Sequence, residues 1–189
     1  MLNYPLTLSF KILALAPQVK VTDANGQTVL YVRQKVLALR EDVKVFSDES
    51  QHHQIYQINA DRIIDWSARY RITDTKGEVL GVVRREGMRS LWKATYHISD
   101  ANEQDVGLIH EENPWIKVLD AFAGMVLQWF INPAYLVDLH GRTTLYLKKR
   151  PAFFEGRFTL DRRADMNERD EALLVTSVLM MLLLERSRG

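Results

Sequence analysis

The sequence contains no cysteine, and its 25 lysines and arginines almost balance its 24 aspartates and glutamates. Without cysteine the chain forms no disulfide, no thiolate metal site and no cysteine nucleophile, and it suits a reducing compartment such as the cytoplasm. A formal net charge of +1 provides no overall field that would attract nucleic acid or an anionic membrane. Any anion site must therefore be local, and no nucleic-acid partner is expected.

Motifs of catalysis are also absent. The chain has no G-x-S-x-G, no P-loop, no G-x-G-x-x-G and no H-E-x-x-H. His97 and His110 would face each other across one predicted hairpin, but a zinc site needs three or four ligands. We therefore expect no enzyme activity, no metal site and no cofactor.

The sequence also lacks a hydrophobic run long enough to span a membrane. Residues 172–184 are nearly all apolar, yet at ~1.5 Å per residue they cover only ~20 Å of a ~30 Å hydrocarbon core. Glu171 and Glu185 close the two ends of this run. A helix that is apolar on all sides must be buried in protein or in lipid, and the short length favours protein. We predict a buried helix, capped by Asp165 or Asn167, and no transmembrane span.

Near the amino terminus, apolar and polar residues alternate, with Leu6, Leu8, Phe10 and Ile12 on one side. This period of two predicts a half-buried strand. Lys11 interrupts the continuous apolar run that a secretory signal would need, so the strand is the preferred interpretation.

A short pattern recurs along the chain. It begins at Val19 in "VKVTDANGQTVLYVR" and at Tyr70 in "YRITDTKGEVLGVVR", and weaker copies follow. The aspartates at the centre of the five copies are Asp23, Asp48, Asp74, Asp100 and Asp138. Aspartate can bond its own backbone two residues on, and Gly26, Gly77 and Gly141 can supply the positive φ of a tight reversal. Each copy therefore predicts a β-hairpin with its aspartate in the turn.

Five hairpins give ten strands, and the segments 6–12 and 153–160 add two more. A meander of this kind removes its two edges by closing into a barrel. We predict a mainly β (α+β) fold, a twelve-stranded antiparallel barrel of consecutive hairpins that encloses the hydrophobic carboxyl-terminal helix. One further helix is expected around 114–131, where apolar residues recur at helical spacing after Asn113 and Pro114.

The consecutive hairpins, the apolar carboxyl-terminal helix and two segments, "NPWIKVLD" and "YLVDLHGRTTLYLKKRPAFFEGRFTL", resemble the LURP-one-related family. That family belongs with tubby carboxyl-terminal domains and phospholipid scramblases. The resemblance covers nearly the whole chain, is strongest from Tyr70 to the end, and implies one domain over 1–189 with the barrel described above. Tubby domains bind phosphoinositides and scramblases are associated with lipid movement and calcium. The acidic stretch "DRRADMNERDEA" lacks the glycine and the ligand spacing of a calcium loop.

Two basic groups are candidate sites for phosphate or lipid headgroups. They are Arg84, Arg85 and Arg89 in "VVRREGMRS", and Lys148, Lys149 and Arg150 at the end of the fifth hairpin. Placed on one rim of the barrel, arginine would bind phosphate by bidentate contacts and lysine as a point charge. The alternative is a pair of solvated strand ends balanced by Glu86 and Glu155.

Three functions follow as hypotheses. The first is a non-catalytic cytoplasmic binding module that engages phospholipid or phosphoinositide headgroups transiently at a membrane surface. The second is a scaffold that binds a protein or a small ligand through the barrel mouth and the inserted helix. The third is a scramblase-like, membrane-anchored lipid protein, which would require the carboxyl-terminal helix to be an anchor.

Overall fold

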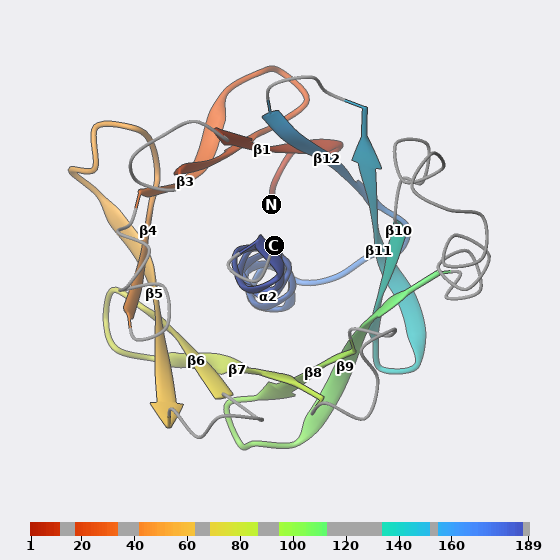
Figure 1. The fold of residues 1–189 in the computed structure, drawn as a ribbon. Coiled ribbons are helices and arrows are strands. Elements are labelled where there is room, and N and C mark those ends of the chain that lie inside the picture. Colours follow the sequence, from red (N-terminus) through yellow and green to blue (C-terminus); the bar gives the residue numbers. More distant parts are fainter. Residues whose placement is uncertain are drawn as a thin grey trace.

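The described chain forms a closed antiparallel β-barrel around one helix (Figure 1). The computed structural model describes residues 1–11, 18–33, 42–62, 69–86, 95–112, 134–151 and 155–186. The elements are β1 (Leu6–Lys11), β2 (Gln18–Thr22), β3 (Thr28–Arg33), β4 (Asp42–Phe46), β5 (Gln54–Arg62), β6 (Arg69–Asp74), β7 (Val79–Arg85), β8 (Tyr96–Asp100), β9 (Asp105–Glu111), β10 (Ala134–Leu139), β11 (Arg142–Arg150), β12 (Glu155–Arg162) and α2 (Glu168–Arg186). The predicted twelve strands are confirmed. The helix expected around 114–131 lies outside the described residues.

Each strand pairs with its neighbours in the sequence, and β1 closes the barrel by pairing with β12. Leu6 lies opposite Leu160 and Leu8 opposite Phe158 in this closing ladder. Leu6, Leu8 and Phe10 are buried, as the alternation predicted for a half-buried strand. Closure leaves the sheet without a free edge.

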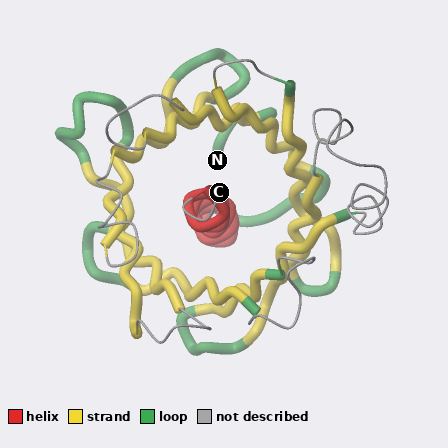
Figure 2. Tube along the Cα trace, viewed as in Figure 1, coloured by secondary structure: helices red, strands yellow, loops and turns green. Residues whose placement is uncertain are grey.

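Helix α2 runs along the inside of the barrel (Figures 1 and 2). Its middle turns are buried on every side. The side chains that show this are each 0% exposed: Leu174, Val178, Leu179 and Met181. A helix that is apolar all round needs such an enclosure, so the predicted buried helix is confirmed. Within the described residues, no helix is both long enough and apolar enough to cross a membrane.

The helix packs closely against β7 because Gly81 has no side chain. A Cβ atom built on Gly81 would lie 2.8 Å from Leu173 Cδ1 and 2.2 Å from the Ser99 carbonyl oxygen. Any larger residue would push α2 or β8 away. This contact sets the side of the barrel against which the helix rests.

Four of the predicted turn aspartates have the same role. In each turn, the aspartate Oδ1 accepts a hydrogen bond from the backbone N–H of the residue two positions later. In three of the four turns, Oδ1 also accepts a hydrogen bond from the backbone N–H of the residue four positions later. These four are Asp23, Asp48, Asp74 and Asp100. The residue three positions after each has positive φ: Gly26, Gln51, Gly77 and Glu103. The weaker copies therefore keep the turn conformation without glycine.

Asp138 does not have this role, and its predicted place in a turn is wrong. It lies within β10, where Thr143 Oγ1 donates to its Oδ1 at 2.7 Å and His110 Nε2 is 2.9 Å from its Oδ2. The chain reverses directly after β10, at His140 and Gly141, which have φ of 50° and 77°. Only the predicted positive φ of Gly141 is confirmed in this copy.

Helix α2 begins with a side-chain cap. Asn167 Oδ1 accepts the backbone N–H of Asp170 at 2.8 Å, and Asn167 Nδ2 donates to the Asp170 carboxylate at 2.9 Å. Of the two candidate caps, Asn167 is therefore the one used. Glu168, Asp170 and Glu171 occupy the first turn, where the helix dipole favours negative charge.

The barrel has two mouths, one at each end of α2. At the amino-terminal mouth lie the four aspartate turns, the amino terminus of the chain and the start of α2. At the carboxyl-terminal mouth, β7 and β11 end and Glu185 of α2 meets Tyr96 at the start of β8.

Candidate functional site

The two predicted basic groups lie at the same mouth but do not form one cluster. Both β7 and β11 end at the carboxyl-terminal mouth, because alternate strands of an antiparallel barrel run in the same direction. Strands β8, β9 and β10 separate them. Arg89 lies outside the described residues, so its place relative to either group stays a prediction.

Arg84 and Arg85 are neighbours in the sequence but face opposite sides of β7. Arg85 faces the lumen beside Tyr96, and its Nε lies 3.6 Å from Glu185 Oε1 of the helix. The Tyr96 hydroxyl donates a hydrogen bond to the same carboxylate oxygen. Arg85 is thus engaged in holding the end of α2.

Arg84 lies on the outer face and is exposed. It stands directly opposite Arg69 on β6 and His97 on β8. Arg69 is 3.1 Å from Glu103, whereas Arg84 makes no ion pair or hydrogen bond with the described residues. A shallow groove of about 300 Å³ beside it is also lined by Glu103 and Asp105, so the local charge is mixed.

The second basic group divides in the same way. Lys148 and Arg150 are exposed, whereas Lys149 faces the same side as the buried Leu147. Arg150 Nε donates to Thr159 Oγ1 at 3.0 Å, and Arg150 stands directly opposite Arg157 on β12. Sequence reasoning missed Arg157, because the register of β11 and β12 had to be known to place it there.

The two strand histidines lie near different acids. His97 Nε2 lies 3.7 Å from Glu86 and His110 Nε2 lies 2.9 Å from Asp138. Across all seven described ranges, no group of three histidine, cysteine, aspartate or glutamate side chains is arranged to hold a metal ion.

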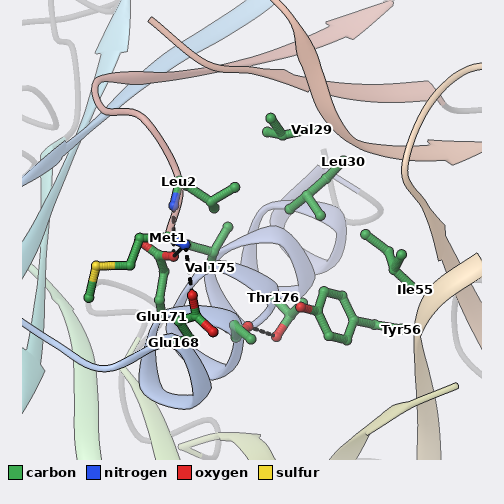
Figure 3. Close-up of a pocket in the computed structure, with 11 residues that line it drawn as sticks. Met1, Leu2, Val29, Leu30, Ile55, Tyr56, Glu168, Glu171, Val175 and Thr176 are labelled. Carbon is green, nitrogen blue, oxygen red and sulfur yellow. Dashed lines mark hydrogen bonds and ion pairs between the residues drawn. The ribbon is translucent and has the colours of Figure 1, made fainter. Parts of the chain in front are cut away.

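A pocket of about 290 Å³ opens at the amino-terminal mouth (Figure 3). It lies between α2 and strands β3 and β5, on a different face of the helix from Leu173, the residue that contacts Gly81. Seven of its eleven lining residues are apolar, and the lining comes from four separate segments of the chain. These residues are Met1, Leu2, Val29, Leu30, Ile55, Tyr56, Glu168, Glu171, Ala172, Val175 and Thr176.

Glu171 is the buried carboxylate of this pocket and is only 4% exposed. Its Oε2 accepts the backbone N–H of Leu2 at 2.8 Å. Its Oε1 is buried and has no hydrogen-bond partner among the described residues. A buried oxygen without a donor costs about 1–3 kcal/mol, so a donor that reached Oε1 would stabilise this carboxylate.

A family model named LURP-one-related matches residues 28–125, which is slightly more than half of the chain. The chain belongs to the LURP-one-related family. The matched residues begin earlier than the segment from Tyr70 onward in which we judged the resemblance strongest. Comparison with curated proteins and with solved structures found no match.

In this LURP-one-related barrel two tyrosines at the amino-terminal mouth lie close to carboxylates. Burial, the charge of Glu171 and a side-chain contact with Glu171 raise the pKa of Tyr4 above its ordinary value. This contact does not have normal hydrogen-bond geometry, so the Tyr4 hydroxyl and Glu171 Oε1 both lack a hydrogen bond of that kind among the described residues. Burial and the charges of Glu171, Asp74 and Glu168 also raise the pKa of Tyr56, which lines the pocket.

What the LURP-one-related barrel can do chemically is different at its two mouths. At the carboxyl-terminal mouth, Arg84, Lys148 and Arg150 offer exposed cations on the outer wall, but on strands that are not neighbours. At the amino-terminal mouth, apolar walls and one buried carboxylate oxygen converge on a single cavity. The second arrangement is the more typical of a small-molecule site.

Proposed function

We propose that this LURP-one-related chain is a non-catalytic binding module that takes a small ligand in the pocket at the amino-terminal mouth. The observation that supports it is Glu171, whose buried Oε1 has no hydrogen-bond partner among the described residues and which lines a cavity of about 290 Å³ with apolar and polar walls. Native binding pockets usually combine apolar walls with a few such polar groups, and range over ~300–1,000 Å³. The pocket is thus near the small end of that range.

Native mass spectrometry of the purified full chain tests this function. We expect a small molecule to co-purify with the protein and to be released on activation. Replacing Ala172, which lines the pocket, by leucine should fill the cavity and remove that mass. Ala101→Leu, in the exposed β8–β9 turn, is the matched control and should retain it. Retention of the ligand by Ala172→Leu would place it elsewhere.

A second candidate function is transient binding of phospholipid headgroups by the exposed Arg84, Lys148 and Arg150, joined by Arg157 opposite Arg150. Arg85 is paired with Glu185 and Lys149 faces the lumen side, so neither is proposed for this role any longer. Headgroup binding would place the chain at a membrane surface on the cytoplasmic side.

Liposome flotation distinguishes this second function. Binding to anionic but not to neutral vesicles, weakened by Lys148→Gln with Arg150→Gln, would support it. Equal absence of binding to both kinds of vesicle would exclude it. Since α2 lies inside the barrel, the scramblase-like alternative, which needed α2 as an anchor, is not proposed.

We also propose that residues 1–189 form one domain. The pairing of β1 with β12 supports this, because the first and last strands must both be present for the barrel to close. Protein binding through the segment around 114–131 stays a prediction, since that segment lies outside the described residues.

A further inference from the structure

We infer that the pocket at the amino-terminal mouth selects a ligand in which a positively charged amine is attached to an apolar group. The inference rests on the proposed function of this pocket and adds the chemical class of its ligand. It follows from where Glu171 lies, from what surrounds it and from what the rest of the cavity wall is made of.

The charge of the pocket is negative and incompletely paired. Glu171 lies at the wall and Glu168 at the rim, where its side chain is 81% exposed. The Met1 amine is 3.1 Å from Glu168 Oε1 and 4.0 Å from Glu171 Oε2, and Glu171 Oε1 has no hydrogen bond of normal geometry with any described residue. Arg162, the cation near Tyr4, is engaged with Asp165 at 2.9 Å.

A buried carboxylate is destabilising unless a donor or an opposite charge meets it. Leu2 supplies a donor to Oε2 only. A ligand ammonium beside Oε1 would supply both a donor and a positive charge, and hydrogen bonds to charged groups contribute about 1.5–3 kcal/mol. A carboxylate or phosphate ligand would instead meet Glu171 and Glu168 and be repelled.

The remaining wall fits an apolar group. Leu30 and Val175 are buried, and Val29 and Ile55 complete the apolar lining around the cavity (Figure 3). A protein cavity of ~150 Å³ accommodates benzene, so ~290 Å³ has room for roughly a dozen non-hydrogen atoms. A metal ion is a poor occupant by comparison, because only two carboxylates line the pocket and calcium takes six to eight oxygen ligands.

Isothermal titration of the full chain with octylamine, octanol and octanoate tests the inference, because the three probes share one apolar chain and differ in head-group charge. We expect octylamine to bind about tenfold or more tightly than octanol, with octanoate weakest. In Glu171→Gln this preference should fall to less than about threefold, since the amide keeps an acceptor for the Leu2 N–H but has no charge.

Glu78→Gln is the matched control, because it removes an exposed carboxylate at the same mouth that does not line the pocket. We expect it to change octylamine affinity by less than about threefold, because an exposed charge outside the pocket contributes little. Ala172→Leu should abolish binding of all three probes. Thermal denaturation of each variant confirms that the barrel is folded before its binding is compared.

The outcomes separate the inference from the function. Equal affinity for octylamine and octanol, or an octylamine affinity unchanged by Glu171→Gln, would overturn the amine class while the pocket remains a binding site. Failure of all three probes to bind the unmodified chain would overturn the proposed pocket itself.

Discussion

The two ends of α2 each bear a carboxylate near a tyrosine, yet their surroundings differ. Glu185, at the carboxyl-terminal mouth, is met by the Tyr96 hydroxyl and by Arg85. Glu171, at the amino-terminal mouth, lines a cavity and has one oxygen that accepts from Leu2, whereas the other makes no hydrogen bond within the part of the chain that the structure describes. Both contacts of Glu185 are to one oxygen, Oε1, and they join the end of α2 to the barrel wall. Glu171 instead lines a cavity, where a ligand could reach the helix.

The helix dipole explains why the two ends need different support. Negative charge is favoured in the first turn of a helix and disfavoured in the last. Glu171 is therefore stabilised by the helix itself and tolerates an incomplete set of partners. Glu185 lies in the last turn, where the dipole disfavours its negative charge. Arg85 supplies an opposite charge, and Tyr96 supplies a hydrogen-bond donor.

Removing the helix should have the largest effect, because both mouths and the core between them depend on it. Deletion of residues 173–184 should abolish cooperative unfolding, since the inward side chains of the barrel would lose their partners. Leu179→Ala, a smaller change in the same buried helix, should cost about 2–5 kcal/mol and leave the barrel folded. Circular dichroism during thermal denaturation measures both. A deletion variant with a sharp transition would show that α2 is an appendage.

Alkaline pH should have the next largest effect, through tyrosines at both mouths. Burial is the main cause that raises the pKa of Tyr4, Tyr96 and Tyr135 above the ordinary value of 10.0. A raised folded-state pKa contributes stability that is complete below pH 10 and is lost as pH rises above it, because the unfolded chain releases these protons first. The urea midpoint should fall over that range.

Single substitutions test whether the tyrosines at the two mouths cause this loss of stability at alkaline pH. Tyr4→Phe and Tyr96→Phe should each make the fall of the urea midpoint less steep, one acting at each end of α2. Potentiometric titration of folded and unfolded protein provides an independent count of the protons released. A midpoint that is constant up to about pH 11 would contradict the expected burial of these hydroxyls.

Neutralising Glu185 and Glu171 one at a time compares how much each carboxylate contributes to stability. Glu185→Gln removes the charge that attracts Arg85 and weakens the bond from Tyr96, so it should reduce the free energy of unfolding by about 1–2 kcal/mol. Glu171→Gln removes an incompletely paired charge and keeps an acceptor for Leu2, so it should change stability by less than about 0.5 kcal/mol. Urea denaturation of both variants measures the difference. Equal losses would mean that the two ends are equivalent.

The aspartate turns at the amino-terminal mouth should have smaller effects than the contacts of Glu185. Gly77→Ala should destabilise the chain by about 1 kcal/mol, because φ is 81° there and no atom lies near enough for a new Cβ to clash. Gln51→Gly should have the opposite sign, since Gln51 adopts φ of 59° without being glycine. Gly77→Asn is the control and should lose less than alanine, because asparagine tolerates this conformation. Thermal melts would contradict the expectation if alanine and asparagine were equally tolerated.

Much of the fold could be predicted because its signals are local. The turn at Asp74 needs only that residue, its own backbone and Gly77, and all of these are adjacent in the sequence. The apolar run of α2 and the alternation in β1 are equally local. The prediction for Asp138 was wrong because its sequence matches the repeated pattern, whereas the turn that follows it is formed by His140 and Gly141.

The candidate sites could be predicted less well, because they depend on which strands meet. Alternation along β7 already implies that Arg84 and Arg85 face opposite sides. The contact of Arg85 with Glu185 joins the first half of the chain to its end and has no local signal. The same is true of Arg157, which lies opposite Arg150 only in the register of β11 and β12.

The sequence by itself determined that this protein has strands, aspartate turns and one buried apolar helix, because each of these follows from side chains within a few residues of one another. Only the tertiary structure decided which carboxylate joins α2 to the barrel wall and which lines a cavity. Glu171 meets Leu2 and faces Ile55 across a cavity because barrel closure brings the start of the chain, β5 and α2 together. That closure is a long-range event, and the position of one unpaired oxygen is its consequence.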